Sequence, residues 1–377
     1  MDPSRAYLDA GGRAPLHPAG RDAWVAALAD GWADPRRLHS EGRRARLLLD
    51  QARAEIAAGL GCRVEELHLT ANHTVSLHRA VAAVTHGRRR VGRGVVVTAV
   101  ERAAVLAAAR VTDPDLDPVP VDRTGRVDLA AWAAAVAAPG VTLAALQHAN
   151  GEVGTLQPVD DAHAAARSAG VPLLVDAGAS VGHVSVGPPW DLLAADPGDW
   201  GGPAGVGVLA VRARVRATPT GPEDEQPWAP GGVSVPAAVG AAAALTAVLA
   251  DRPAADVRRR ALLARVRAAA ALVPDVEVVG DPGASLPHVL TFSCLYVDGE
   301  ALLGELDRRG FAVGSGSACT SGSLEPSHVL AAMGVLTHGN VRIALPREAT
   351  DAAVDAFCAA LPQAVATVRR LLGVTGL

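Results

Sequence analysis

Lysine is absent from the sequence: all 35 residues in the combined Lys and Arg count are arginines. An arginine guanidinium stays protonated and does not form Schiff bases, so covalent chemistry that depends on a lysine amine is excluded within this chain. Aromatic residues are also scarce, at 3%, although half of the residues are apolar. The net charge is only −4 and the basic residues are scattered, which excludes an electrostatic footprint for nucleic acid or a polybasic membrane patch.

Cysteine is rare as well, with four residues that show neither CxxC spacing nor a Cys/His ligand pattern. This argues against a zinc site and against a disulfide framework. The segment from Met1 to Arg5 carries charge where a signal peptide needs an apolar core. The longest apolar run, Pro236 to Ala250, is too short to span a bilayer. We therefore expect a cytoplasmic protein with no membrane or nucleic-acid partner.

Apolar, β-rich runs alternate with helical patterns through the first two thirds of the 377 residues. This alternation is typical of an α/β domain in which helices cover both faces of a mostly parallel sheet. Two Ala-rich helical stretches follow, Pro236 to Ala250 and Asp256 to Val273, and we place the domain boundary between them. The rest of the chain has the pattern of a small α+β domain.

The most informative stretch is the Gly/Ser-rich run from Gly314 to His328, which contains Cys319 and has no hydrophobic anchor before Leu324. Such flanks cannot bury a side chain, so we expect the thiol on an exposed, mobile loop, where it can react. The other cysteines, Cys62, Cys294 and Cys358, lie in apolar or helical surroundings. For them a buried, unreactive thiol is the better interpretation.

The Cys319 run closely resembles the active-site loop of the cysteine desulfurases, which belong to the class V aminotransferase group of fold type I pyridoxal phosphate enzymes. Further stretches carry the resemblance along the chain: Tyr7–Gly12, Val100–Val105, His148–Gly154, Val175–Gly182, Gly201–Gly205 and Val341–Leu345. The resemblance implies a large domain over residues 15–250 with a sheet of the seven-stranded type. It also implies a small domain from residues 1–14 and 251–377, a homodimer, and a persulfide on the loop cysteine.

The cofactor pocket that the resemblance implies is mostly replaced. Asp199 stands at the position of the lysine that holds the cofactor, and a carboxylate there cannot form the aldimine and would repel the phosphate. Gly198 replaces the family's histidine before that lysine, and Arg102 replaces the ring-stacking histidine. Gly151 stands for an asparagine and Ala179 for a glutamine. Gly231-Gly232 replaces a cross-subunit Gly-Thr phosphate contact. The cofactor is thus pyridoxal phosphate by family, but we expect no covalent binding, or no cofactor at all.

Other family positions survive, each with a simpler structural alternative. Asp176 matches the carboxylate that pairs with the pyridine nitrogen, but a strand-end Asp also caps helices. Thr74 matches a phosphate contact at a helix start, or is a plain cap. Arg342 matches the arginine that binds the substrate carboxylate, or forms a structural ion pair. His148 and Glu152 lie where such sheets place ligands, and for His148 a satisfied buried histidine is the favoured interpretation.

Three functions remain open. The favoured one is a protein of sulfur transfer or iron–sulfur assembly without desulfurase turnover, in which Cys319 accepts a persulfide or acts as a cluster ligand; no other metal site is expected. Its partners would be a sulfur acceptor or an iron–sulfur scaffold. The second is a structural or regulatory subunit of an active desulfurase, for which Cys319 is dispensable. The third is an active enzyme with non-covalent pyridoxal phosphate, or with a lysine borrowed from another chain.

Overall fold

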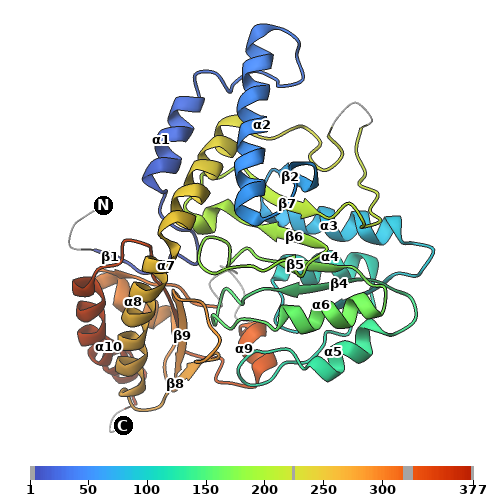
Figure 1. Ribbon diagram of the computed structural model, residues 1–377. Helices are drawn as coiled ribbons and strands as arrows, with labels where there is room; N and C mark the ends of the chain where they lie inside the picture. Colours follow the sequence, from blue (N-terminus) through green and yellow to red (C-terminus); the bar gives the residue numbers. More distant parts are fainter. Residues whose placement is uncertain (1–4, 223–225, 317–325, 375–377) are drawn as a thin grey trace.

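A six-stranded sheet is the centre of the larger part of the molecule, in a computed structural model that describes residues 5–222, 226–316 and 326–374 (Figure 1). In sheet order its strands are β2 (Leu67–Thr70), β7 (Gly207–Val211), β6 (Leu192–Ala195), β5 (Leu173–Asp176), β4 (Val141–Gln147) and β3 (Gly94–Val97). Strands β3, β4, β5 and β6 run parallel to one another, whereas β7 is antiparallel to both β6 and β2. This confirms the α/β fold with a mostly parallel sheet.

The sheet has one strand fewer than the seven expected, in the part of the chain that the structure describes. A further edge strand next to β3 is reduced to an isolated bridge between Thr98 and Val119. The Val119 N–H donates to the Val97 carbonyl, and the Val119 carbonyl accepts from Ala99. Val119 stands between two prolines, which have no N–H to donate, so the ladder cannot continue on either side.

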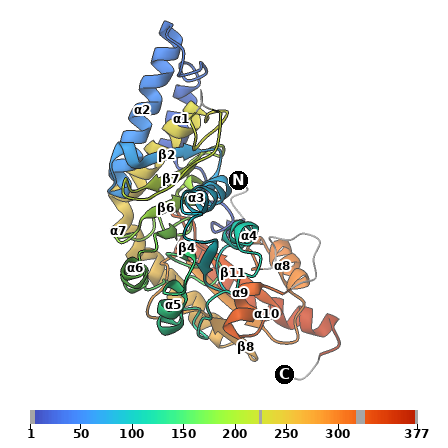
Figure 2. The ribbon, with the colours of Figure 1, turned by 90° about the vertical axis from the view of Figure 1, so that its right-hand side faces the viewer.

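Helices cover both faces of the sheet (Figure 2). Side chains alternate between the two faces along each strand, so both faces are apolar and both need a covering layer. The helices of this part are α1 (Pro18–Ala27), α2 (Ser40–Leu60), α3 (His73–Gly87), α4 (Ala103–Thr112), α5 (Leu129–Val136), α6 (Val159–Ser168) and the first half of α7 (Val235–Ala271), with 3-10 turns η1 (Val64–Glu66) and η2 (Pro197–Trp200). Val96 packs into one core with helices α2, α5, α6 and α7, whereas Val95 and Val97 pack into another with α3 and α4.

A smaller antiparallel sheet forms the rest of the molecule. Its strand order is β11 (Asn340–Ala344), β9 (Val289–Cys294), β8 (Val276–Val279), and it packs with α8 (Gly299–Arg308) and α10 (Asp351–Leu371). The chain start joins this part, because β1 (Ala6–Tyr7) pairs in parallel with β10 (Phe311–Ala312). The short helix α9 (His328–Met333) packs against residues of both parts, including Val100 and Val279.

Helix α7 (Val235–Ala271) runs through both hydrophobic cores. It replaces the two helices expected from the sequence, because Pro253 lies inside one continuous helix instead of ending it. By length and composition alone α7 could cross a membrane, but 56% of its most apolar window is buried inside the protein, as in a core helix. The expected boundary at residue 250 falls within α7, and the division into two domains stays a prediction.

Candidate functional site

Asp176 is the centre of a charged cluster at the carboxyl end of β5, where parallel sheets place their ligands. Its Oδ1 accepts a hydrogen bond from the Gly178 N–H at 2.9 Å and lies 2.8 Å from His73 Nε2. Its Oδ2 accepts from Arg102 Nε at 3.0 Å. Burial alone would raise the pKa of Asp176, but Arg102 and His73 hold that pKa well below its usual range. Both carboxylate oxygens therefore have partners within the chain.

Arg102 enters this cluster from the start of α4, where it is the residue before the helix. Asp176, followed by Asp199 and Asp196, raises the pKa of Arg102 further above its usual range, so its charge is permanent. The side chain of Arg102 is 41% exposed, and its Nε forms an ion pair with Asp176 Oδ2 at 3.0 Å. A Cβ atom on Gly178 would come within 2.9 Å of Arg102 Nη2 and 2.7 Å of His73 Nε2, so only glycine leaves room for this arrangement.

Asp199 lies in η2, next to Asp196, whose side chain caps this turn by accepting from the Gly198 N–H at 2.9 Å. Loss of contact with water, followed by repulsion from Asp196, raises the pKa of Asp199 well above its usual range. A protonated or ionised carboxyl can donate or accept a hydrogen bond, but it cannot act as an amine nucleophile.

A small cavity of about 170 Å³ opens beside this cluster, at the amino end of α3. Thr74 lines it, as the resemblance implies for a phosphate contact, together with Asn72, which caps the helix. Arg13 lines the same cavity, and a Cβ on Gly198 would already lie 3.2 Å from its guanidinium carbon. Ligand pockets of cofactor size measure about 300–1,000 Å³, so this cavity suits only a smaller group.

The residues present do not fit pyridoxal phosphate. His73 and Gly178 already bind Asp176 Oδ1, and Arg102 binds Oδ2, so a pyridinium would have to share Oδ2 with the charged guanidinium of Arg102. The space that a histidine at position 198 would need is occupied by Arg13. A Cβ on Gly151 would meet only Ala179, at 3.4 Å, so two small residues face each other where the resemblance implies two amides. No lysine exists to hold the cofactor.

Arg342 lies in β11, with a side chain that is only 11% exposed. Its Nη2 donates to Asp9 Oδ1 at 2.9 Å, so the structural ion pair considered for this residue is present. Its Nε is buried and has no hydrogen-bond partner among the described residues. A substrate carboxylate would have to displace Asp9, or share the guanidinium with it.

Cys319 lies outside the described residues. The described residue nearest before it, Gly316, donates its N–H to Asn340 Oδ1 at 2.9 Å. Gly316 also packs against Glu152, whose Oε1 is buried without a partner among the described residues. Burial raises the pKa of Glu152 above its usual range.

The other three cysteines have pKa values raised by burial: to about 11 for Cys62, to about 12 for Cys294, and in the same direction for Cys358. A thiol with such a pKa is protonated at neutral pH and a weak nucleophile. This agrees with their interpretation as unreactive residues.

Several contacts of the site could not be predicted from the sequence. His73 and Asp176 are 103 positions apart, and Asp9 and Arg342 are 333 positions apart. The position of His73 next to Thr74, at a helix start, was the one local signal. His148 was expected to be satisfied, but its Nδ1 is buried with no partner in the described chain, and burial lowers its pKa to about 4.

Comparisons with known proteins place the chain among relatives of similar length. The model of the family described as "Aminotransferase class-V" matches residues 6–357. A cysteine desulfurase of Cereibacter sphaeroides is 33% identical and covers 97% of this chain and 97% of its own. The cysteine desulfurase IscS of Dictyoglomus turgidum is 31% identical, over 90% of this chain and 89% of its own. A solved structure of a NifS-like protein superposes with a TM-score of 0.88 at 25% identity, covering 96% of this chain and 100% of that one.

Proposed function

Because the chain belongs to the class V aminotransferase family, and within it to the cysteine desulfurases, we propose that it is a sulfur-transfer protein without desulfurase turnover of its own. The family depends on pyridoxal phosphate, and in it the cofactor releases sulfur from cysteine. In this chain the cofactor step would be lost, while Cys319 still receives and passes on sulfur.

The observation that carries this proposal is the internal pairing of Asp176. Arg102 and His73 bind its two oxygens, and the carboxylates Asp196 and Asp199 lie close to Arg102. A cofactor that brings a phosphate and a phenolate would have to compete with Arg102 for Asp176 and would lie close to two further acidic residues. Without lysine, it would also lack its covalent anchor and the amine that moves the substrate proton.

Cys319 is the residue that we propose accepts sulfur. Its thiolate would attack the outer sulfur of a persulfide on an active desulfurase or on a small-molecule donor. The S–S bond of the donor breaks, the donor leaves as a thiolate, and the outer sulfur remains on Cys319 as a new persulfide. No electrons are gained or lost overall, and the Cys319 run has a Gly/Ser-rich composition, from which we expect an accessible thiol.

The test uses the full chain incubated with an active cysteine desulfurase and L-cysteine, then intact-mass spectrometry. We expect a mass increase of one sulfur atom in the wild type and in a Cys358→Ser control, and none in Cys319→Ser. Equal labelling of wild type and Cys319→Ser would contradict a role for Cys319. No labelling by the desulfurase or by a small-molecule persulfide would leave the structural or cluster-ligand role.

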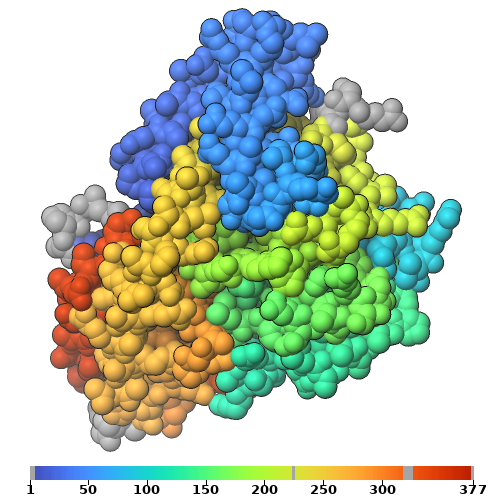
Figure 3. Space-filling model, viewed as in Figure 1, coloured from blue at the N-terminus to red at the C-terminus, as the bar shows by residue number. Residues whose placement is uncertain are grey.

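Association with a second chain is part of the same proposal. Helices α1 and α2 project from the body of the molecule (Figure 3). They and their connection expose large apolar side chains, with Trp32 71%, Leu38 87% and Leu47 70% exposed. Large exposed apolar groups of this kind suit an interface, and the family resemblance implies a homodimer.

A regulatory role beside an active desulfurase would use the same apolar region with a different partner. Sedimentation of the purified protein at micromolar concentration should give a dimer. A Trp32→Glu variant should shift it toward monomer, because a carboxylate would have to be buried in the interface. A wild-type monomer that forms a complex with an active desulfurase would favour the regulatory alternative.

A further inference from the structure

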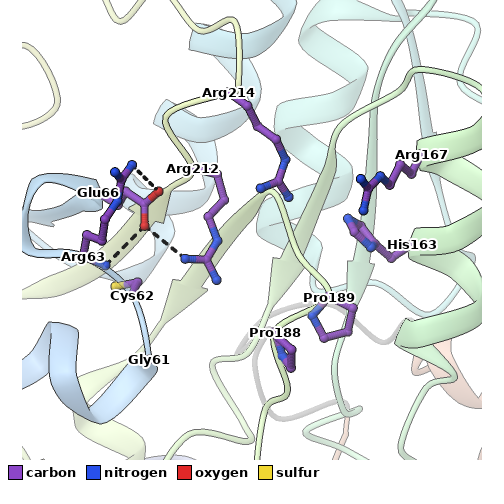
Figure 4. Close-up of a pocket in the computed structure, with 10 residues that line it drawn as sticks. All are labelled: Gly61, Cys62, Arg63, Glu66, His163, Arg167, Pro188, Pro189, Arg212 and Arg214. Carbon is purple, nitrogen blue, oxygen red and sulfur yellow. Dashed lines mark hydrogen bonds and ion pairs between the residues drawn. The ribbon is translucent and has the colours of Figure 1, made fainter.

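A hollow of about 720 Å³ lies at the amino-terminal edge of the central sheet, at the opposite end of β5 from Asp176. It is lined by residues from the end of α2, from α6 and from the segment that follows β7. Figure 4 shows arginines and His163 around its sides, with Pro188 and Pro189 forming its lower wall. None of these residues takes part in the cluster around Asp176.

The carboxylates at this hollow are already engaged. Glu66 accepts hydrogen bonds from Arg63 and Arg212, both at 3.0 Å. Although burial would raise the pKa of Glu66, these two arginines help to lower it to about 2, so it stays ionised. Asp191, which follows Pro189 by two residues, forms an ion pair with Arg214 at 2.8 Å. With Arg167, four arginines lie at this hollow, and even with Glu65, which also acts on Arg63, positive charge is in excess.

The arginines keep hydrogen-bond donors to spare, because each guanidinium carries five N–H groups. Arg212 is held in place: its side chain is 16% exposed and its Cζ lies 3.6 Å from the centre of the Trp190 ring. The Arg167 side chain forms no hydrogen bond or ion pair with any other described residue, and it is exposed beside His163 (Figure 4). The neighbouring Cys62 thiol, with a pKa of about 11, adds no negative charge.

We infer that this hollow binds a nucleotide-sized phosphate ester, with its phosphoryl groups on Arg167, Arg212 and Arg214 and its organic part against Pro188 and Pro189. The planar guanidinium fork matches phosphate oxygens in pairs, and a pre-positioned arginine loses little freedom on binding. The hollow is open to solvent, and its volume of about 720 Å³ exceeds what a single phosphate fills. The apolar proline wall favours such an ester over an acidic peptide, which would present charge along its whole length.

Isothermal titration of the full chain with ATP, pyrophosphate and adenosine tests this inference. We expect ATP to bind, pyrophosphate to bind more weakly, and adenosine not to bind. Arg167→Ala should weaken ATP binding about tenfold or more, because it removes charge-assisted hydrogen bonds. Arg110→Ala is the matched control, since Arg110 also lies exposed in the last turn of a ten-residue helix, on the other face of the sheet. It should leave ATP binding unchanged.

Four results would overturn the inference. ATP could fail to bind at millimolar concentration, or adenosine could bind as well as ATP. Arg110→Ala could weaken ATP binding as much as Arg167→Ala does, which would indicate general charge attraction. A glutamate-rich peptide could bind where ATP does not, which would make this region a docking face for an acidic protein.

Discussion

The two edges of the central sheet differ in their charged residues. At the carboxyl edge three aspartates, Asp176, Asp196 and Asp199, act on the guanidinium of Arg102. At the amino edge four arginines line one hollow, together with Glu66. The family to which the chain belongs depends on an anionic cofactor at the carboxyl edge. Here Asp199 stands at that edge in place of the family's lysine, and the group of arginines lies at the other end of the strands.

The fold is shared with relatives while the residues of the ligand site differ, so the two change independently. The sheet, its covering helices and its superposition on a NifS-like structure are retained, because they depend on apolar side chains. The site depends on a few polar residues, and changes at positions such as Arg102 and Asp199 are enough to turn it into an internal ion cluster.

The largest effect is expected from Asp176→Asn, which removes the charge that holds the carboxyl edge together. Arg102 and His73 would keep their positions but lose the carboxylate that pairs with them. Removing one partner of a buried ion pair costs about 3–5 kcal/mol, and because Arg102 is partly exposed we expect about 3 kcal/mol in the free energy of unfolding. Urea titration measures it, with exposed Asp22→Asn as a control. A loss no larger than that of the control would mean that the cluster does not stabilise the fold.

Next in size is a pH effect of Glu101, which lies fully buried beside the same edge. Burial raises its pKa to about 8, and its Oε2 has no partner in the described chain. The folded protein therefore holds this proton up to about pH 8, whereas an unfolded chain releases it near pH 4.3. Between these values the folded state binds more protons, so stability falls as pH rises, by about 2–4 kcal/mol from pH 5 to 8.

Glu101→Gln should remove this slope, because glutamine does not titrate. Urea unfolding of both proteins at pH 5, 6, 7 and 8 gives the difference at each pH, in which the contributions of other groups cancel. The variant should gain on the wild type steadily as pH rises. A constant difference would show that Glu101 has the same pKa in the folded and unfolded states.

A smaller effect is expected at the amino edge, from Arg212→Ala. The change removes one of two arginines on Glu66 and the contact with the Trp190 ring, but Arg63 remains. We expect about 1–2 kcal/mol of lost stability. Arg214→Ala, at a side chain that is 57% exposed, should cost no more than about 0.5 kcal/mol. Equal losses for the two variants would mean that Arg212 is not pre-positioned by its contacts.

Much of this fold could be predicted from the sequence, because apolar runs report burial directly. The alternation of apolar runs and helical patterns predicted the mostly parallel sheet with helices on both faces, and this is what the structure has. Local patterns failed where tertiary packing decided the outcome. Pro253 did not end its helix, and the strand β6 (Leu192–Ala195) was not predicted from its short Leu-Leu-Ala-Ala run.

The site was predictable only in part, for a similar reason. The resemblance identified Asp199 and Arg102 as departures, but it did not show that Arg102 turns onto Asp176. The contacts of His73 and Arg13 join segments far apart along the chain, and no local pattern reports such pairs.

The smallest effect is expected from Asp199→Lys, which restores the family's lysine alone. Arg102 would still bind Asp176, and Arg13 would still occupy the space beside Gly198. We expect no conversion of L-cysteine to alanine in the presence of pyridoxal phosphate, in the variant as in the wild type. Turnover by the single variant would show that the internal ion cluster is not a barrier to the cofactor.

We expect that this chain does not hold pyridoxal phosphate as its relatives do. The most direct measurement is the visible spectrum of the purified protein with added pyridoxal phosphate, followed by borohydride reduction and intact-mass spectrometry, with a lysine-containing cysteine desulfurase as the positive control. We expect no aldimine band and no reduced cofactor on the chain. A stoichiometric aldimine band that borohydride fixes onto the protein would contradict this expectation.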